Sequence, residues 1–234
     1  MNMSVPRQLG LAVTLRDDAT FDNFTVGANG AVVALMKQLG QANGEPRLYI
    51  WGPLGAGRTH LLQATCHALS ERDLRCVYVP LSERAELSPA MLEELEHSEV
   101  ACIDDIDVIA GDAPWEHAMF DFYNRAAATG CALLMAASAA PSALPWGLAD
   151  LKSRLAASLI YRVEVLNDDA KMAALQQRAQ RRGMELNDEA ATFLLRHVRR
   201  DTRHLFELLD RLDTASLAAQ RRLTVPFIKQ VLNT

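Results

Sequence analysis

Residues 52–59 read GPLGAGRT, the spacing of a phosphate-binding loop with one residue changed. Such loops read Gly, four free positions, Gly, Lys and then Ser or Thr, and their backbone N–H groups surround a phosphate. Here Arg58 occupies the Lys position. Arg is planar and forked, whereas Lys is a compact point charge. We therefore expect a diphosphate site that positions a γ-phosphate poorly, with nucleotide contacts from the loop residues Gly52, Gly55, Ala56, Gly57, Arg58 and Thr59.

The segments around this loop fit the structure that the motif needs. Residues 47–51 form a short apolar strand pattern, and residues 60–69 have helical periodicity. A helix that begins at Thr59 would direct its positive end at the anion, and the Thr59 hydroxyl could bind Mg²⁺. A glycine-rich turn between a strand and a helix also occurs without a nucleotide, so the loop alone leaves that alternative open.

A second apolar segment, residues 99–103, ends in Asp104 and Asp105. An acid at the tip of a buried strand beside a phosphate loop can hold Mg²⁺, usually through water, which makes Asp104 a candidate metal residue. Asp105 could orient an attacking water, but it is one methylene shorter than the Glu common at this place. The alternative is that both acids lie in a solvated loop after the strand and bind neither a metal nor a nucleotide. Ser138 follows another apolar segment and could contact a γ-phosphate, or it could begin the turn before Pro141.

Strand and helix patterns alternate along the first two thirds of the chain. Strands are expected at residues 48–51, 76–79, 100–103, 132–136 and 159–165, and helices near 29–39, 59–70, 89–97 and 115–128. Near-continuous apolar strands that alternate with helices predict an α/β fold, a parallel five-stranded sheet with helices on both faces. From 168 on, only helices are expected (168–182, 188–199, 202–219 and 225–232), with Gly183 as a left-handed cap. We expect an extended tail (1–20), an α/β domain (21–166) and a small all-helical lid (167–234).

Composition limits the function classes. The chain has 234 residues, a net charge of −5 and no apolar run long enough to cross a membrane or act as a signal peptide. Its four cysteines (Cys66, Cys76, Cys102 and Cys131) are far apart, without a CxxC pair or a His at metal-ligand spacing. Three of them lie in apolar or helical segments and are interpreted as small buried hydrophobic residues, which fits a reducing, cytoplasmic compartment.

Together these features resemble an AAA+ domain of the bacterial initiator DnaA type, and most closely its relatives that regulate replication initiation. The resemblance covers nearly the whole chain and is carried by residues 20–24, 57–62, 103–106, 151–155 and 221–229. Arg in place of the loop Lys is a feature of those regulators. After the helical lid we expect no helix-turn-helix domain of the kind with which DnaA reads DNA. With the negative net charge, this predicts no sequence-specific DNA binding.

The resemblance implies roles for further residues. Arg154 would be an arginine finger that enters the nucleotide site of a neighbouring protein. Arg203 would fold down on the phosphates. The alternative is a solvated helical face, of which the i, i+3, i+4, i+7 spacing is typical; its residues are Arg196, Arg199, Arg200 and Arg203. Val26, Gly27 and His60 would belong to the chain's own nucleotide site, which is expected to hold ADP or another nucleoside diphosphate.

The N-terminal tail resembles the short peptide that docks replication proteins on the β sliding clamp. Gln8 would bind at the rim of the clamp's pocket, and Leu9, Leu11 and Val13 would fill it. The family resemblance then implies a clamp-bound regulator that stimulates hydrolysis of DnaA-bound ATP. Two alternatives stay open: an independent ATPase that remodels or loads a replication protein, and a binding module with an empty site. The oligomeric state is not predicted, and a homo-oligomer is one outcome.

Overall fold

The computed structural model describes residues 15–16, 18–41, 44–197, 202–219 and 222–232. Its strands are β1 (Arg47–Trp51), β2 (Cys76–Pro80), β3 (Val100–Asp104), β4 (Ala132–Ala137) and β5 (Leu159–Arg162). Its α-helices are α1 (Gly30–Lys37), α2 (Arg58–Ser70), α3 (Ala113–Thr129), α4 (Ala149–Ala156), α5 (Asp168–Arg181), α6 (Asp188–His197), α7 (Thr202–Ala219) and α8 (Val225–Leu232). Short 3₁₀ turns are η1 (Phe21–Asn23), η2 (Leu81–Glu86), η3 (Pro89–Leu92), η4 (Leu95–His97), η5 (Ile106–Ile109) and η6 (Pro141–Ala143).

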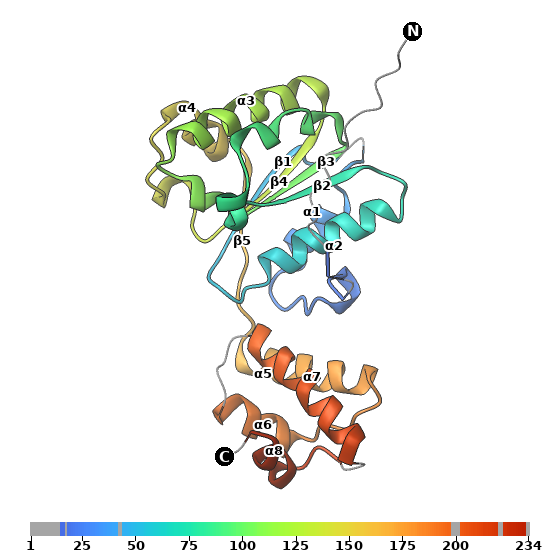
Figure 1. Ribbon diagram of the computed structural model, residues 1–234. Helices are drawn as coiled ribbons and strands as arrows, with labels where there is room; N and C mark the ends of the chain where they lie inside the picture. Colours follow the sequence, from blue (N-terminus) through green and yellow to red (C-terminus); the bar gives the residue numbers. More distant parts are fainter. Residues whose placement is uncertain (1–14, 17, 42–43, 198–201, 220–221, 233–234) are drawn as a thin grey trace.

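The five strands form one parallel sheet in the order β2-β3-β4-β1-β5. Helices α1 and α2 cover one face and α3 and α4 the other (Figure 1). Alternate strand residues point to opposite faces, so Leu48 and Ile50 join the core under α1 and α2, while Tyr49 joins the core under α3 and α4. The predicted fold class, a parallel sheet with helices on both faces and a helical lid, is confirmed.

One predicted helix differs from the structure, and one observed helix was not predicted. The helix expected at residues 89–97 is wrong: the segment forms η3 and η4, separated by Glu94 in a left-handed conformation (φ 66°). Arg125 of α3 explains the break, because its guanidinium donates to the carbonyl of Leu92 and to the buried carboxylate of Glu96. The first bond satisfies a backbone carbonyl that a continuous helix would pair within itself, and the second holds the Glu96 side chain against α3. Helix α4 was not predicted as an element.

The last strand is shorter than expected because a side chain takes over its hydrogen bonding. β5 ends at Arg162, and Val163 makes one further backbone bond to Trp51. Beyond it, the buried side chain of Asn29, at the start of α1, donates to the carbonyl of Glu164 and accepts from the amide of the same residue. This pair of bonds fixes the direction in which the chain leaves the sheet.

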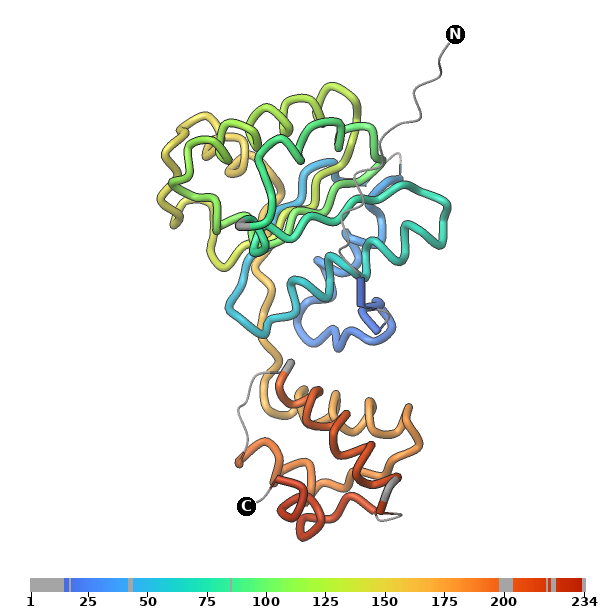
Figure 2. The backbone as a smooth tube through the Cα atoms, in the orientation of Figure 1, coloured from blue at the N-terminus to red at the C-terminus, as the bar shows by residue number. Residues whose placement is uncertain are grey.

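Helices α5 to α8 pack around a separate core of buried leucines and phenylalanines. Gly183 adopts φ 74° at the end of α5, and the amide of Met184 returns to the carbonyl of Ala179, so the predicted left-handed cap is confirmed. One extended segment, residues 163–167, joins this helical unit to the sheet (Figure 2). α5 and α7 lie on the side of the unit nearest the α/β body (Figure 1).

Candidate nucleotide-binding site

The glycine-rich loop connects the end of β1 to the start of α2, and its glycines are required by space and by backbone conformation. A Cβ at Gly52 would lie 2.5 Å from the carbonyl oxygen of Val163. Gly57 has φ 95°, and a Cβ there would lie 2.7 Å from the ring of Phe24. Both positions therefore exclude larger residues. The loop leaves the N-terminus of α2 open toward an anion.

Arg58, the departure from the usual loop sequence, lies inside this site. Its side chain is only 10% exposed, and Nη2 lies 3.8 Å from a carboxylate oxygen of Asp105. Nη1 is buried and has no hydrogen-bond partner among the described residues. A buried guanidinium nitrogen without a partner is costly unless an anion binds it. The site therefore fits a phosphate group.

The two acids at the end of β3 have different surroundings. Asp104 is buried, accepts hydrogen bonds from the Tyr78 hydroxyl (2.8 Å) and the Asp105 amide (3.0 Å), and interacts with the Thr59 hydroxyl. Burial, and then the charge of Asp105, raise the pKa of Asp104 above its ordinary value. Thr59 and Asp104 thus meet as a hydroxyl and a carboxylate, which are oxygen ligands that Mg²⁺ accepts.

Ser138 lies just after β4, and both its amide and its hydroxyl donate hydrogen bonds to Asp107. Its amide donates to one carboxylate oxygen of Asp107 at 3.1 Å, and its hydroxyl donates to the other. It stands in the bend that leads to Pro141. This geometry favours the turn interpretation of Ser138 over a contact with a phosphate.

A cavity of about 280 Å³ lies between the α/β body and the lid. The loop residues Gly55, Ala56, Gly57, Arg58 and Thr59 line it, together with His60. Further lining residues were not predicted: Arg16, Asp18, Ala19, Asn23, Phe24, Thr25, Asn29, Leu54, Gln63, Leu166, Arg178, Phe206, Glu207 and Asp210. Val26 and Gly27 lie between the lining residues Thr25 and Asn29, and a Cβ at Gly27 would touch the lining residue Leu166 at 2.9 Å.

His60 anchors the segment that precedes α1. Its Nε2 lies 2.8 Å from the carbonyl of Thr20, and its ring lies 5.5 Å from that of Phe24 in a tilted arrangement. Burial lowers the pKa of His60 below its ordinary value, which favours the neutral imidazole. His60 is therefore placed to hold Phe24 over the loop.

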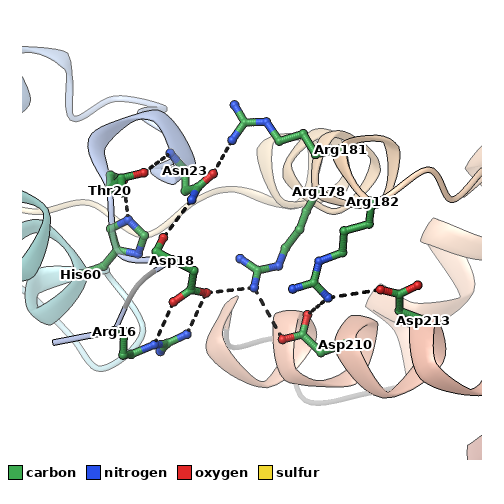
Figure 3. Close-up of polar contacts among 10 residues, drawn as sticks. All are labelled: Arg16, Asp18, Thr20, Asn23, His60, Arg178, Arg181, Arg182, Asp210 and Asp213. Carbon is green, nitrogen blue, oxygen red and sulfur yellow. Dashed lines mark hydrogen bonds and ion pairs between the residues drawn. The ribbon is translucent and has the colours of Figure 1, made fainter. Parts of the chain in front are cut away.

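A polar network joins the lid to the α/β body at the rim of the cavity (Figure 3). Arg178 of α5 lies 3.0 Å from Asp18 of the α/β body and 3.5 Å from Asp210 of α7. Arg181 donates to the Asn23 side chain at 2.5 Å and to the Asp22 carbonyl at 2.8 Å. Arg178 also lies over the Phe206 ring, 4.9 Å from its centroid. The lid is thus attached to residues 18–23 beside the cavity.

The other predicted functional residues lie apart from the cavity or outside the described residues. Arg154 is exposed on α4 and does not line the cavity, and the part of the chain that the structure describes offers its guanidinium no partner. Arg203 lies in α7, but its side chain is outside the described residues. Gln8, Leu9, Leu11 and Val13 also lie outside them. No helix that the structure describes is long and apolar enough to cross a membrane.

A phosphate-binding loop after β1, an acid at the end of β3, which β4 separates from β1, and a helical lid over the cleft define an AAA+ nucleotide-binding fold. Comparison with known families agrees. Residues 15–162 match the family described as bacterial DnaA ATPase domain, and residues 168–232 match the one described as Hda, lid domain. The chain belongs to the bacterial DnaA ATPase family, within which its lid is of the Hda type, as the sequence resemblance predicted.

Solved structures share this fold. Domain III of the Thermotoga maritima replication initiation protein DnaA is 21% identical, with a TM-score of 0.78 over 94% of this chain and 98% of that one. AMPPCP-bound DnaA from Aquifex aeolicus is 20% identical, with a TM-score of 0.72 over 87% and 67%. The Thermotoga maritima RuvB Holliday junction branch migration motor is 15% identical, with a TM-score of 0.67 over 87% and 67%. The family relationship makes this chain a DnaA-related regulator of replication.

Proposed function

We propose that this protein binds a nucleoside diphosphate in its own site and stimulates hydrolysis of ATP bound to DnaA by inserting Arg154 into the DnaA site. The observation that carries the proposal is the position of Arg154. It is exposed on α4, away from the chain's own cavity, and no described residue pairs with its guanidinium. An arginine in this state is available to a partner's phosphates.

The chain's own site is suited to hold a diphosphate. Backbone N–H groups of the loop and the free Nη1 of Arg58 would bind its phosphates, and Thr59 with Asp104 would hold Mg²⁺. The bound nucleotide would supply a partner for Nη1 of Arg58, while Nη2 faces Asp105. ADP is the diphosphate we expect, since relatives of the DnaA family bind adenine nucleotides, as in AMPPCP-bound DnaA.

Binding without efficient turnover is supported by the ion pair inside the site. Asp105 is the acid available to orient water, but its carboxylate faces Arg58 at 3.8 Å. This ion pair directs the carboxylate toward the guanidinium and away from the role of orienting a water. Ser138, the other candidate for a γ-phosphate contact, donates to Asp107 instead. The independent ATPase alternative has no comparable support from the geometry.

Recruitment through the N-terminal tail remains part of the proposal. Gln8, Leu9, Leu11 and Val13 would dock on the β sliding clamp. The described chain begins beside α2, where the Arg16 amide donates to Gln63 and the Arg16 carbonyl lies 3.0 Å from His67 Nε2. Replacing Gln8 and Leu9 with Ala should abolish clamp binding while circular dichroism stays unchanged, and retained binding would refute this assignment.

Replacing Arg154 tests the proposal directly. Arg154→Ala should lower stimulation of DnaA-bound ATP hydrolysis by at least about 100-fold, because arginine fingers contribute about 10³–10⁵ in rate in GTPases. The measurement is release of labelled phosphate from preloaded DnaA in the presence of clamp on DNA. Lys152→Ala, on the same helix, is the matched control and should keep full stimulation. Normal stimulation by Arg154→Ala would reject the proposed role.

A further inference from the structure

Three cysteines that lie far apart in the sequence meet inside the α/β body. Cys66 comes from α2, Cys76 from β2 and Cys102 from β3, and their sulfur atoms all lie within 4.8 Å of one another. Sγ of Cys76 lies 3.3 Å from that of Cys66 and 3.7 Å from that of Cys102. All three are free thiols. We propose that Cys66, Cys76 and Cys102 form a three-sulfur site for a soft, monovalent metal ion of the Cu(I) class.

The spacing of the sulfurs fits a metal ion in their centre. An ion that is bonded to three sulfurs at about 2.3 Å in a trigonal plane holds them about 4.0 Å apart. Two of the observed separations, 3.3 and 3.7 Å, are shorter than that spacing by less than about 1 Å, and all three lie within 4.8 Å. Small side-chain rotations would therefore complete the site, without a change in the backbone.

The donor set selects the ion. Sulfur donors favour Cu(I), Zn²⁺ and iron–sulfur clusters over the hard ions Mg²⁺ and Ca²⁺. Structural Zn²⁺ sites close on four ligands, but no fourth His, Cys, Asp or Glu joins this group among the residues that the structure describes. A monovalent ion with a coordination number of three fits this group of three sulfurs better than Zn²⁺ does. The Mg²⁺ proposed at Thr59 and Asp104 would not compete for this site.

The site has a route in from the surface of the sheet. Metal ions bind the thiolate form of cysteine, so the ion must displace the thiol protons as it enters. Cys66 and Cys102 are buried, but Cys76 is partly exposed on β2, an edge strand of the sheet. An ion would therefore meet Cys76 first, and binding would release protons from the thiols.

The site would reinforce the elements that carry the phosphate site. α2 begins with Arg58 and Thr59, β3 ends with Asp104, and Tyr78 of β2 bonds to Asp104. An ion held by Cys66, Cys76 and Cys102 would connect these three elements through metal–sulfur bonds at a point away from the phosphate site. Because it binds the folded chain, it should raise the melting temperature.

Anaerobic titration of the full, phosphine-reduced chain with Cu(I) tests the proposal, with bicinchoninate as a coloured competing chelator. The wild type should withdraw one equivalent of copper, show thiolate-to-copper absorption in the near ultraviolet and melt at a higher temperature. Cys76→Ser should bind at least about 100-fold more weakly, the upper end of the loss seen when only an outer-shell partner is removed. Cys131→Ser, a buried cysteine outside the cluster, should bind like the wild type.

Protection against alkylation gives a second readout that does not depend on a variant. One equivalent of Cu(I) should protect Cys76 of the wild type from iodoacetamide, as read by peptide mass spectrometry. Three results would overturn the proposal: no copper withdrawn by the folded wild type, wild-type affinity in Cys76→Ser, or a Cys66–Cys76 disulfide, two hydrogens lighter, in place of bound copper.

Discussion

Replacing Gly57 or Gly130 with Ala tests how much the close approach of the loop to Phe24 matters, because only Gly57 faces the Phe24 ring. Both have a left-handed backbone, with φ 95° and 81°. A Cβ at Gly57 would lie 2.7 Å from the Phe24 ring, whereas nothing lies within 4 Å of one at Gly130. Gly→Ala should therefore cost about 1–2 kcal/mol of strain at either site. At Gly57 the displaced ring adds about 1–3 kcal/mol, the usual cost of overpacking.

The free energy of unfolding can be followed by tryptophan fluorescence during urea denaturation. The three tryptophans (Trp51, Trp115 and Trp146) all lie in the α/β body, so the signal reports this part of the chain. Calorimetry with ADP gives the second readout. Gly57→Ala should weaken ADP binding at least about tenfold, equivalent to about 1.4 kcal/mol, because Phe24 and the loop line the cavity. Gly130→Ala should leave ADP affinity unchanged.

A double mutant checks the reasoning about Phe24. In a Phe24→Ala background the ring is gone, so Gly57→Ala should cost no more than Gly130→Ala costs in the wild type. Equal losses of stability and equal ADP affinities for the two single glycine variants would refute the argument. So would a Gly57→Ala cost that stays the same without Phe24.

Three further results are expected. Arg178→Gln should lower the melting temperature and reduce the free energy of unfolding by about 1–2 kcal/mol, measured by urea denaturation. This is less than the usual value of a charged hydrogen bond, because Asp18 is 37% exposed. The control Arg75→Gln breaks an exposed ion pair and should cost under about 0.5 kcal/mol. Burial raises the pKa of Asp18, but hydrogen bonds from Arg178 and Arg16 outweigh this effect and hold the pKa below 3.8. The stability that Asp18 contributes is therefore complete above pH 3.8 and is lost as the pH falls further. Asp18→Asn should not show this loss of stability in an acid titration. Arg58→Ala should weaken ADP binding in calorimetry, and an unchanged affinity would mean that the guanidinium does not contact the phosphates.

The strand, loop and helix of the candidate site were predictable because each is specified by a local stretch of sequence. The glycine spacing of residues 52–59 specifies the loop by itself, and the apolar run before Asp104 specifies a buried strand that ends at the same edge of a parallel sheet. The lid helices were predictable in the same way from their periodicity and from Gly183. The meeting of Thr59 and Asp104 then follows from the fold class.

Contacts between distant elements could not be predicted from these patterns. The cysteines converge only because β2 pairs with β3 and α2 packs over both. Asp18 and Arg178 meet only when the lid is placed over the body, so neither was singled out. The composition of segment 89–97 favours a helix. Its observed conformation depends on hydrogen bonds from Arg125, which belongs to α3.

ATP turnover by the isolated chain most directly tests the claim that its own site binds nucleotide without efficient chemistry. Purified protein with ATP and Mg²⁺ would be followed by phosphate release, with nucleotide occupancy measured in the same sample. The account predicts an occupied site and phosphate release no faster than the background without protein. Rapid release that Asp105→Asn abolishes would contradict it.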